Sequence, residues 1–238
     1  MNVLYFKNQE SSIKGKIYLK RKKQIYFDTS KVKPMIKIIH QILCLWLLIF
    51  LAACGDPTPQ LERLSDDAII LAFGDSLTYG TGAEKNESYP VILENTINRK
   101  VINAGVPGEL SMQGLKRLPK LLDKHQPKLL ILCHGGNDIL RKENLAEAET
   151  NIRQMIALAE NKNIPVILLG VPKPGLFLSP AKLYANIAEN TNVVFMPNLI
   201  ADVLSDASMK SDPFHPNKAG YREIAFALAN TLQDASAL

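Results

Sequence analysis

Cysteine is scarce in this chain of 238 residues, and its scarcity excludes a fold held together by disulfides. Of the three cysteines, Cys44 and Cys54 lie in or directly after an apolar stretch near the N-terminus, and Cys133 alone lies in the remainder. Cys133 falls inside an apolar run. A lone cysteine in such a run is expected to be a small buried side chain, not a reactive thiol.

Basic residues are not in excess over most of the chain, although the whole carries a formal net charge of +5. Residues 1–54 hold 10 of the 28 basic and 2 of the 23 acidic residues, which leaves 18 against 21 in residues 55–238 and a net charge of −3 there. Binding of nucleic acid depends on a basic surface. The charge balance therefore gives no case for a nucleic acid partner.

Long apolar runs are also missing. The run of 12 residues from Ile42 to Ala53 is too short to cross about 30 Å of hydrocarbon as a helix. Its length, the basic segment that begins at Met35 and the small residues before Cys54 are typical of a secretory signal. Leu51–Cys54 resembles a bacterial lipobox, which implies cleavage before Cys54 and attachment of lipid to its thiol.

This pattern predicts the domain organisation. We expect residues 1–54 to be a leader of the lipoprotein type with its true start at Met35, residues 55–67 to be a tether, and residues 68–238 to form one folded domain. An extended signal from residue 1 and an uncleaved spanning anchor are the alternatives. Lipid on Cys54 would hold the domain to a membrane of a bacterial cell envelope, facing the periplasm.

Apolar runs alternate with amphipathic segments throughout the predicted domain. The expected strands cover residues 68–73, 100–103, 129–133, 165–169 and 193–196, and the expected helices cover residues 88–99, 112–126, 144–163 and 218–232. Strands that are apolar throughout predict a parallel sheet covered on both faces, which is a three-layer α/β/α fold. Right-handed crossovers then bring the loops that follow the strands to one edge of the sheet.

Ser76 follows the first expected strand and is therefore placed at that edge. A serine hydroxyl becomes a strong nucleophile only when a base accepts its proton and a third group orients the base. His215 is the candidate base, and Asp212, three residues earlier, is the candidate third group. A surface turn with a helix cap is the alternative interpretation of this Asp-x-x-His pair.

Another histidine competes for the role of base. His134 lies beside Gly135 and Gly136 at the same edge, and Asp138 is the acid nearest to it in the sequence. It could serve as the base or shape the pocket.

Acyl transfer also needs donors for the oxyanion of its tetrahedral intermediate. The backbone N–H groups of Ser76 and Gly108 and the side-chain amide of Asn137 are candidates, because each follows an expected strand. Taken singly, Gly108 is better explained as a turn glycine and Asn137 as a turn residue. Together with Asp212 and His215 they fill each role that an acyl hydrolase requires.

Four segments resemble the sequence blocks of the SGNH (GDSL) hydrolases in order and spacing: Gly74–Leu77, Asn103–Gly108, Gly135–Asp138 and Asp212–His215. The stretch from Asn103 to Arg141 is particularly similar to the bacterial periplasmic thioesterase/lysophospholipase branch, also called arylesterases. The resemblance covers roughly residues 69–229. It implies a flavodoxin-like, five-stranded parallel sheet with strand order 2-1-3-4-5.

By this resemblance Ser76 is the nucleophile, Asp212 and His215 complete the triad, and Gly108 and Asn137 complete the oxyanion hole with Ser76. It implies a secreted serine esterase that cleaves carboxylic esters or thioesters through an acyl-enzyme, without metal or organic cofactor. A carbohydrate acetylesterase acting on envelope or extracellular glycans is the alternative within the fold. A catalytically dead lipoprotein that serves as a binding module is the alternative from another class.

Two places depart from the pattern of that branch. Pro107 and Glu109 stand where small or polar residues are commoner. The segment after the fourth expected strand, residues 172–180, is short and apolar. We expect its residues Leu176, Phe177 and Leu178 to line the acyl pocket, so this departure bears on the preferred acyl chain length.

Overall fold

The computed structural model describes residue 41, residues 60–175 and residues 178–238. The chain divides into two compact units, residues 1–56 and 57–238. In the first unit only Gln41 is described, an exposed residue in a helix. The expected leader, the start at Met35 and the lipidation site at Cys54 thus lie outside the described residues. Among the helices that are described, none is both long and apolar enough to cross a membrane.

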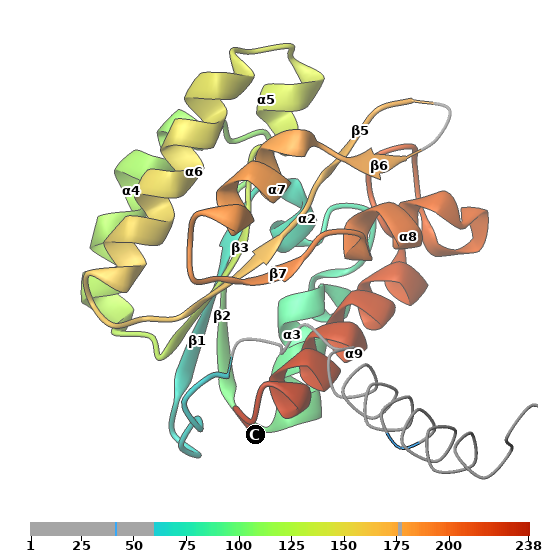
Figure 1. The fold of residues 1–238 in the computed structure, drawn as a ribbon. Helices are drawn as coiled ribbons and strands as arrows, with labels where there is room; N and C mark the ends of the chain where they lie inside the picture. Colours follow the sequence, from blue (N-terminus) through green and yellow to red (C-terminus); the bar gives the residue numbers. More distant parts are fainter. Residues whose placement is uncertain (1–40, 42–59, 176–177) are drawn as a thin grey trace, which may run out of the picture. The chain divides into compact units, whose positions relative to one another are not determined.

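The second unit is organised around one five-stranded sheet whose strands are all parallel (Figure 1). Its strands are β1 (Ile69–Gly74), β2 (Lys100–Gly105), β3 (Leu129–Cys133), β4 (Val166–Leu169) and β7 (Val194–Met196). They lie side by side in the order β2-β1-β3-β4-β7. Because β7 is the fifth strand of this sheet along the chain, this is the predicted order 2-1-3-4-5, and the prediction is confirmed.

The strands form because short apolar runs can be buried on both faces of a parallel sheet. Every residue of β3 and β4 is buried, as are the last five residues of β1. The register pairs Gly74 at the end of β1 with Gly105 of β2 and with Cys133 of β3. The three loops that follow these strands therefore leave the sheet at the same level, as expected from the crossovers.

Helices cover both faces of the sheet, which gives the three predicted layers (Figure 1). On one face α3 (Tyr89–Ile97) packs against α9 (Lys218–Asp234), and on the other α4 (Ser111–His125) packs against α6 (Leu145–Glu160). The remaining helices are α2 (Ser76–Tyr79), α5 (Gly136–Leu140), α7 (Lys182–Glu189), α8 (Leu199–Ser205) and the 3-10 helices η1 (Lys85–Glu87) and η2 (Ala207–Met209). Asn217 caps α9 as predicted, since its side chain accepts hydrogen bonds from the N–H groups of Ala219 and Gly220.

Residues 172–205 contain elements that the sequence pattern did not predict. Strands β5 (Pro172–Lys173) and β6 (Ser179–Pro180) pair antiparallel in a small separate sheet. Helix α7 precedes β7 along the chain, and helix α8 follows it. Each of these elements has eight residues or fewer, which is too short for a clear period in the sequence.

Candidate active site

The turn after β1 places Ser76 at the first position of α2, where the carboxyl ends of the strands meet. Gly74 allows this turn to pass close to β3, because a Cβ on Gly74 would overlap the carbonyl oxygen of Cys133. The Asp75 side chain accepts a hydrogen bond from the N–H of Leu77 at 3.1 Å and so caps α2. The backbone position of Ser76 is therefore set by its neighbours on both sides.

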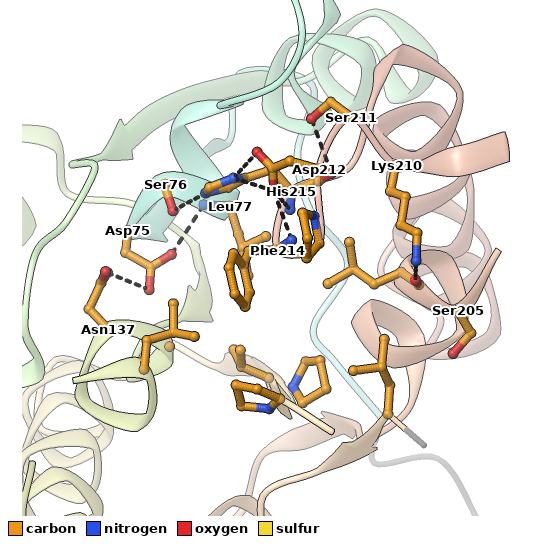
Figure 2. Close-up of a pocket in the computed structure, with 18 of the residues that line it drawn as sticks. Asp75, Ser76, Leu77, Asn137, Ser205, Lys210, Ser211, Asp212, Phe214 and His215 are labelled. Carbon is orange, nitrogen blue, oxygen red and sulfur yellow. Dashed lines mark hydrogen bonds and ion pairs between the residues drawn. The ribbon is translucent and has the colours of Figure 1, made fainter. Parts of the chain in front are cut away.

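His215 and Asp212 reach Ser76 from the loop before α9 (Figure 2). The Nε2 atom of His215 lies 3.0 Å from the Oγ atom of Ser76, although the two residues are 139 positions apart. On the other side of the imidazole, Nδ1 lies 2.8 Å from Oδ2 and 3.0 Å from Oδ1 of Asp212. The structure thus brings together the three residues that the sequence predicted as a triad.

The loop itself orients Asp212. Its Oδ1 atom accepts hydrogen bonds from the backbone N–H groups of Phe214 at 2.8 Å and His215 at 3.0 Å. Partial burial acts to raise the pKa of Asp212, but the hydrogen bonds from the His215 ring and from these two amides outweigh it and lower the pKa below its ordinary value. Asp212 is therefore held as a carboxylate, the form that can stabilise a protonated imidazole.

Asn137 lies at the start of α5, close to Ser76 and its neighbours (Figure 2). Its amide nitrogen donates to the backbone carbonyl of Glu109 at 3.1 Å and, in a longer contact of 3.4 Å, to the carboxyl group of Asp75. Burial raises the pKa of Asp75. The amide predicted as an oxyanion donor is thus near the nucleophile and is held by one short and one long hydrogen bond.

Gly108 is less directly placed. It has a φ of +78°, a conformation that favours glycine, and its carbonyl accepts a hydrogen bond from Arg141 at 2.9 Å. The N–H of Val106 donates to the carbonyl of Gly74 at 3.0 Å, which holds this loop against the end of β1. Gly108 is not one of the residues that line the cavity in the part of the chain that the structure describes. Its role as an oxyanion donor stays a prediction.

A cavity of about 840 Å³ opens beside the Ser76 hydroxyl. Much of its wall is apolar and comes from α5, the β5–β6 segment, α8 and the loop of the triad: Leu140, Val171, Pro172, Leu178, Leu204 and Phe214. Leu178, which the sequence predicted to line the acyl pocket, is one of the residues that line this cavity. Leu176 and Phe177 lie outside the described residues.

His134 does not compete for the role of base. Its ring is fully buried, and Nε2 lies 3.1 Å from the carboxylate of Glu109, while Nδ1 accepts a hydrogen bond from the N–H of Gly135 at 3.0 Å. Both ring nitrogens are therefore committed to partners other than Ser76. The acid that faces His134 is Glu109 and not Asp138, because the fold brings the loop after β2 against the end of β3.

Asp138 has a structural contact that the sequence did not reveal. Its carboxylate accepts hydrogen bonds from the backbone N–H of Ser111 at 2.9 Å and from the Ser111 hydroxyl at 2.6 Å. The amide of Asn151 donates to the same hydroxyl at 3.0 Å. This buried network fixes α5, the helix that carries Asn137, to the helices α4 and α6. Its members are 27 and 40 residues apart, so no short motif could have indicated it.

Two further observations on the described part of the chain concern a cysteine and the possibility of a metal site. Cys133 is a free, fully buried cysteine, as predicted, and burial raises the pKa of its thiol well above the ordinary value. No set of three or more His, Cys, Asp or Glu side chains within residues 60–175 and 178–238 is arranged to hold a metal ion.

A serine in contact with a His–Asp pair, at the carboxyl edge of a parallel sheet and beside an apolar cavity, defines a hydrolase of the serine type. The model of the GDSL-like Lipase/Acylhydrolase family matches residues 72–223. The chain belongs to this family, which confirms the predicted resemblance to SGNH hydrolases and identifies an enzyme that acts on ester bonds.

Individual relatives support the same assignment. Thioesterase 1/protease 1/lysophospholipase L1 of Escherichia coli (strain K12) is 31% identical over 199 residues, which cover 80% of this chain and 90% of that protein. An arylesterase of Vibrio mimicus is 30% identical over 174 residues, covering 68% of this chain and 87% of that protein. The crystal structure of AlinE4, an SGNH-hydrolase family esterase, matches with a TM-score of 0.57 and 33% identity over 73% of this chain and 98% of the other.

Proposed function

We propose that this protein is a secreted, lipid-anchored serine esterase that cleaves carboxylic esters or thioesters through an acyl-enzyme, with Ser76 as its nucleophile. The observation that carries the proposal is the 3.0 Å contact between the Ser76 hydroxyl and Nε2 of His215, with Asp212 on the other ring nitrogen. A base in this position can take the serine proton as the hydroxyl attacks an acyl carbon.

The reaction then follows from the contacts of the three side chains. As the Ser76 oxygen bonds to the acyl carbon, its proton passes to Nε2 of His215, and the charged ring is stabilised by Asp212 2.8 Å from Nδ1. The same proton passes to the departing alcohol or thiol as the bond to it breaks. A water molecule then gives a proton to His215 and attacks the acyl carbon. This proton passes from His215 to the Ser76 oxygen as its bond to the acyl carbon breaks, which releases the acid and restores the Ser76 hydroxyl.

The carbonyl oxygen becomes negatively charged during both attacks and needs hydrogen-bond donors. The Asn137 amide can supply one by exchanging its longer contact with Asp75 for the oxyanion while it keeps its bond to Glu109. The backbone N–H of Ser76 lies at the start of α2 and is the second donor. Gly108 is proposed as the third.

The cavity supports an apolar acyl group as the preferred substrate. Leucine, valine, proline and phenylalanine side chains form much of its wall, and about 840 Å³ is far more space than an acetyl group fills. The names of the relatives, a thioesterase and lysophospholipase and an arylesterase, agree with this class of substrate. Comparison of acetylated sugars with medium-chain acyl esters separates the proposed esterase from a carbohydrate acetylesterase.

The test of the nucleophile is Ser76→Ala, assayed on a p-nitrophenyl acyl ester together with labelling by a fluorophosphonate. We expect both turnover and labelling to be lost, and we expect Ser208→Ala, a change of an exposed serine in η2, to retain both. Undiminished turnover by Ser76→Ala would refute the assignment. Absence of labelling in the unchanged protein would favour the dead binding module.

The anchoring part of the proposal rests on the lipobox-like sequence Leu51–Cys54. Cells that express the full chain with radiolabelled palmitate are expected to produce a labelled, membrane-bound protein. Cys54→Ala should remove the label and release the domain. A full chain that carries no label would overturn the anchoring and leave the esterase assignment unaffected.

A further inference from the structure

Behind the candidate oxyanion donors lies a group of ionisable side chains, called here the Glu109 cluster and formed by the buried Glu109 and His134 and the partly buried Arg117. The guanidinium of Arg117 binds the Glu109 carboxylate with two hydrogen bonds, of 2.9 Å from Nε and 2.6 Å from Nη2. Nε2 of His134 lies 3.1 Å from the same carboxylate. The Glu109 side chain is 7% exposed, and His134 is fully buried.

The charges of the cluster follow from its contacts. Because the N–H of Gly135 donates to Nδ1 of His134, the ring proton is carried by Nε2, which donates to Glu109. Burial acts to raise the pKa of Glu109, but the hydrogen bonds from His134 and Arg117 outweigh it and lower the pKa below the ordinary value. Glu109 is thus a carboxylate with donors on two sides.

The surroundings of the cluster are closely fitted to it. A Cβ on Gly114 of α4 would overlap the His134 ring, so only glycine at this position leaves room for the imidazole. Arg117 donates a further hydrogen bond to the carbonyl of Ala104 at 3.0 Å, and its guanidinium lies 4.3 Å from the centre of the Phe73 ring. The cluster therefore connects α4 with the ends of β1, β2 and β3.

The cluster touches both loops that carry the predicted oxyanion donors. Glu109 directly follows Gly108, and its backbone carbonyl is the one that accepts the 3.1 Å hydrogen bond from Asn137. His134 directly precedes the Gly135–Asn137 segment, and its ring holds the N–H of Gly135. A single carboxylate thus links the loop after β2 to the loop after β3.

We infer that Glu109 is a positioning residue for the esterase reaction: its carboxylate, held between Arg117 and His134, fixes the carbonyl that orients the Asn137 amide toward the oxyanion. This inference rests on the proposed function. Donors that are fixed before the reaction need no reorganisation when charge develops, so loosening them reduces the rate of the chemical step. Glu109 does not touch the substrate and acts only through Asn137 and its loop.

Another ion pair in the domain provides a matched control. Glu149 and Arg153 of α6 lie 2.8 Å apart, and Arg153 also donates to a backbone carbonyl, that of Asn186, at 2.7 Å. This pair has the same chemistry but links α6 to α7. If a carboxylate–guanidinium pair only contributes to folding, Glu109→Gln and Glu149→Gln should behave alike.

The first test compares kcat and KM for a p-nitrophenyl acyl ester. We expect Glu109→Gln to lower kcat about tenfold, a part of the roughly 10²–10³-fold that loss of an oxyanion donor costs. KM should stay within about twofold, since only transition-state interactions are weakened. Glu149→Gln should leave both constants unchanged. Equal kcat values for the two variants would overturn the inference.

His134 provides an independent pair of variants in case Glu109→Gln does not fold. His134→Gln retains an N–H donor toward Glu109, and His134→Leu removes it at similar volume. We expect the leucine variant to lose about as much kcat as Glu109→Gln, and the glutamine variant to recover most of it. Equal activities of the two would contradict a role for the donor.

A double-mutant cycle tests whether Glu109 acts through Asn137. In an Asn137→Ala background Glu109→Gln should cause little further loss of kcat, because the amide that it orients is gone. Losses that multiply would refute the connection. Ser76→Ala and fluorophosphonate labelling are measured alongside. If Ser76→Ala remains active the proposed function fails, whereas an inactive Ser76→Ala beside a fully active Glu109→Gln overturns only the positioning role.

Discussion

Asp212 and His215 meet within one turn of an exposed loop, whereas the groups around Asn137 come from distant parts of the chain. The first pair is three residues apart, and the Asp212 side chain is 44% exposed. Asn137 instead contacts residues 28 and 62 positions away, and Glu109, which holds it, is 7% exposed. One half of the site is local and open to water, and the other is non-local and buried.

The difference shows which contacts hold the side chains of each half in position. The loop of the triad is closed by its own hydrogen bonds, such as that from the N–H of Ser211 to the carbonyl of His215 at 2.9 Å. The region around Asn137 depends on polar and charged side chains that hydrogen-bond to one another largely out of contact with water, where an unpaired polar group is costly. We therefore expect changes in the loop to affect activity alone, and changes behind Asn137 to affect activity and stability together.

The largest effect is expected in the local half. Asp212→Asn should lower kcat on the order of 10⁴-fold, because an amide can favour the wrong tautomer of His215 and cannot stabilise the imidazolium. The melting temperature should change little, since the side chain is well exposed. Kinetics on an acyl ester and a thermal melt check both parts. A loss of less than tenfold would mean that the loop orients His215 without the carboxylate.

A smaller loss of rate is expected from the buried half. Asn137→Ala should raise the barrier by about 2.7–4 kcal/mol if the amide donates to the oxyanion. The substitution also removes the hydrogen bond to the backbone carbonyl of Glu109. The midpoint of unfolding by urea should therefore fall to a lower urea concentration. A loss of rate far below this range would assign Asn137 a structural role only.

Gly114→Ala tests the fit behind Asn137 without touching a charged group. The added methyl overlaps the His134 ring, and overpacking costs about 1–3 kcal/mol. This exceeds the roughly 0.5–1 kcal/mol that alanine contributes over glycine in a helix interior. We expect a net loss of unfolding free energy and a lower kcat. A variant more stable than the original would show that His134 moves freely.

The smallest expected effect is a change with pH in the free energy of unfolding. It tests the buried half of the site, which contains Glu109. The pKa of Glu109 is lower in the folded protein than its ordinary value of 4.5, so its stabilising contribution is complete above that pH and is lost as pH falls through the folded-state pKa. Glu109→Gln should therefore be less stable near neutral pH, and the difference should narrow in acid. Urea unfolding at several pH values measures it. A difference that does not change with pH would contradict the charged state of Glu109.

The predicted site residues that the structure brings together were indicated by short-range patterns. Asp212 and His215 are close in the sequence, and Ser76 and Asn137 each follow an apolar run that had to be a strand. Because parallel strands end at one edge, the topology alone brings these residues together. The five-stranded sheet could be predicted for the same reason, since each of its strands is a short apolar run.

The remainder could not be predicted, because it depends on contacts between buried residues far apart in the chain. His134 was interpreted as a possible base, since its sequence neighbours do not reveal that Glu109, 25 positions earlier, faces its ring. Glu109 was noticed only as a departure from a family pattern. Gly114 did not indicate its contact with His134, because the sequence does not distinguish a glycine that makes room for a ring from one that permits a turn.

The two ends of the described domain are joined to each other. The N–H groups of Leu61 and Leu64 donate to the carbonyls of Ala235 and Ala237 at 2.9 and 2.8 Å, and both of these alanines are fully buried. A short linker from residue 238 back to residue 60 would thus join two segments that are already hydrogen-bonded to each other. New ends could then be opened at an exposed turn such as residues 161–163, so this domain is well suited to circular permutation.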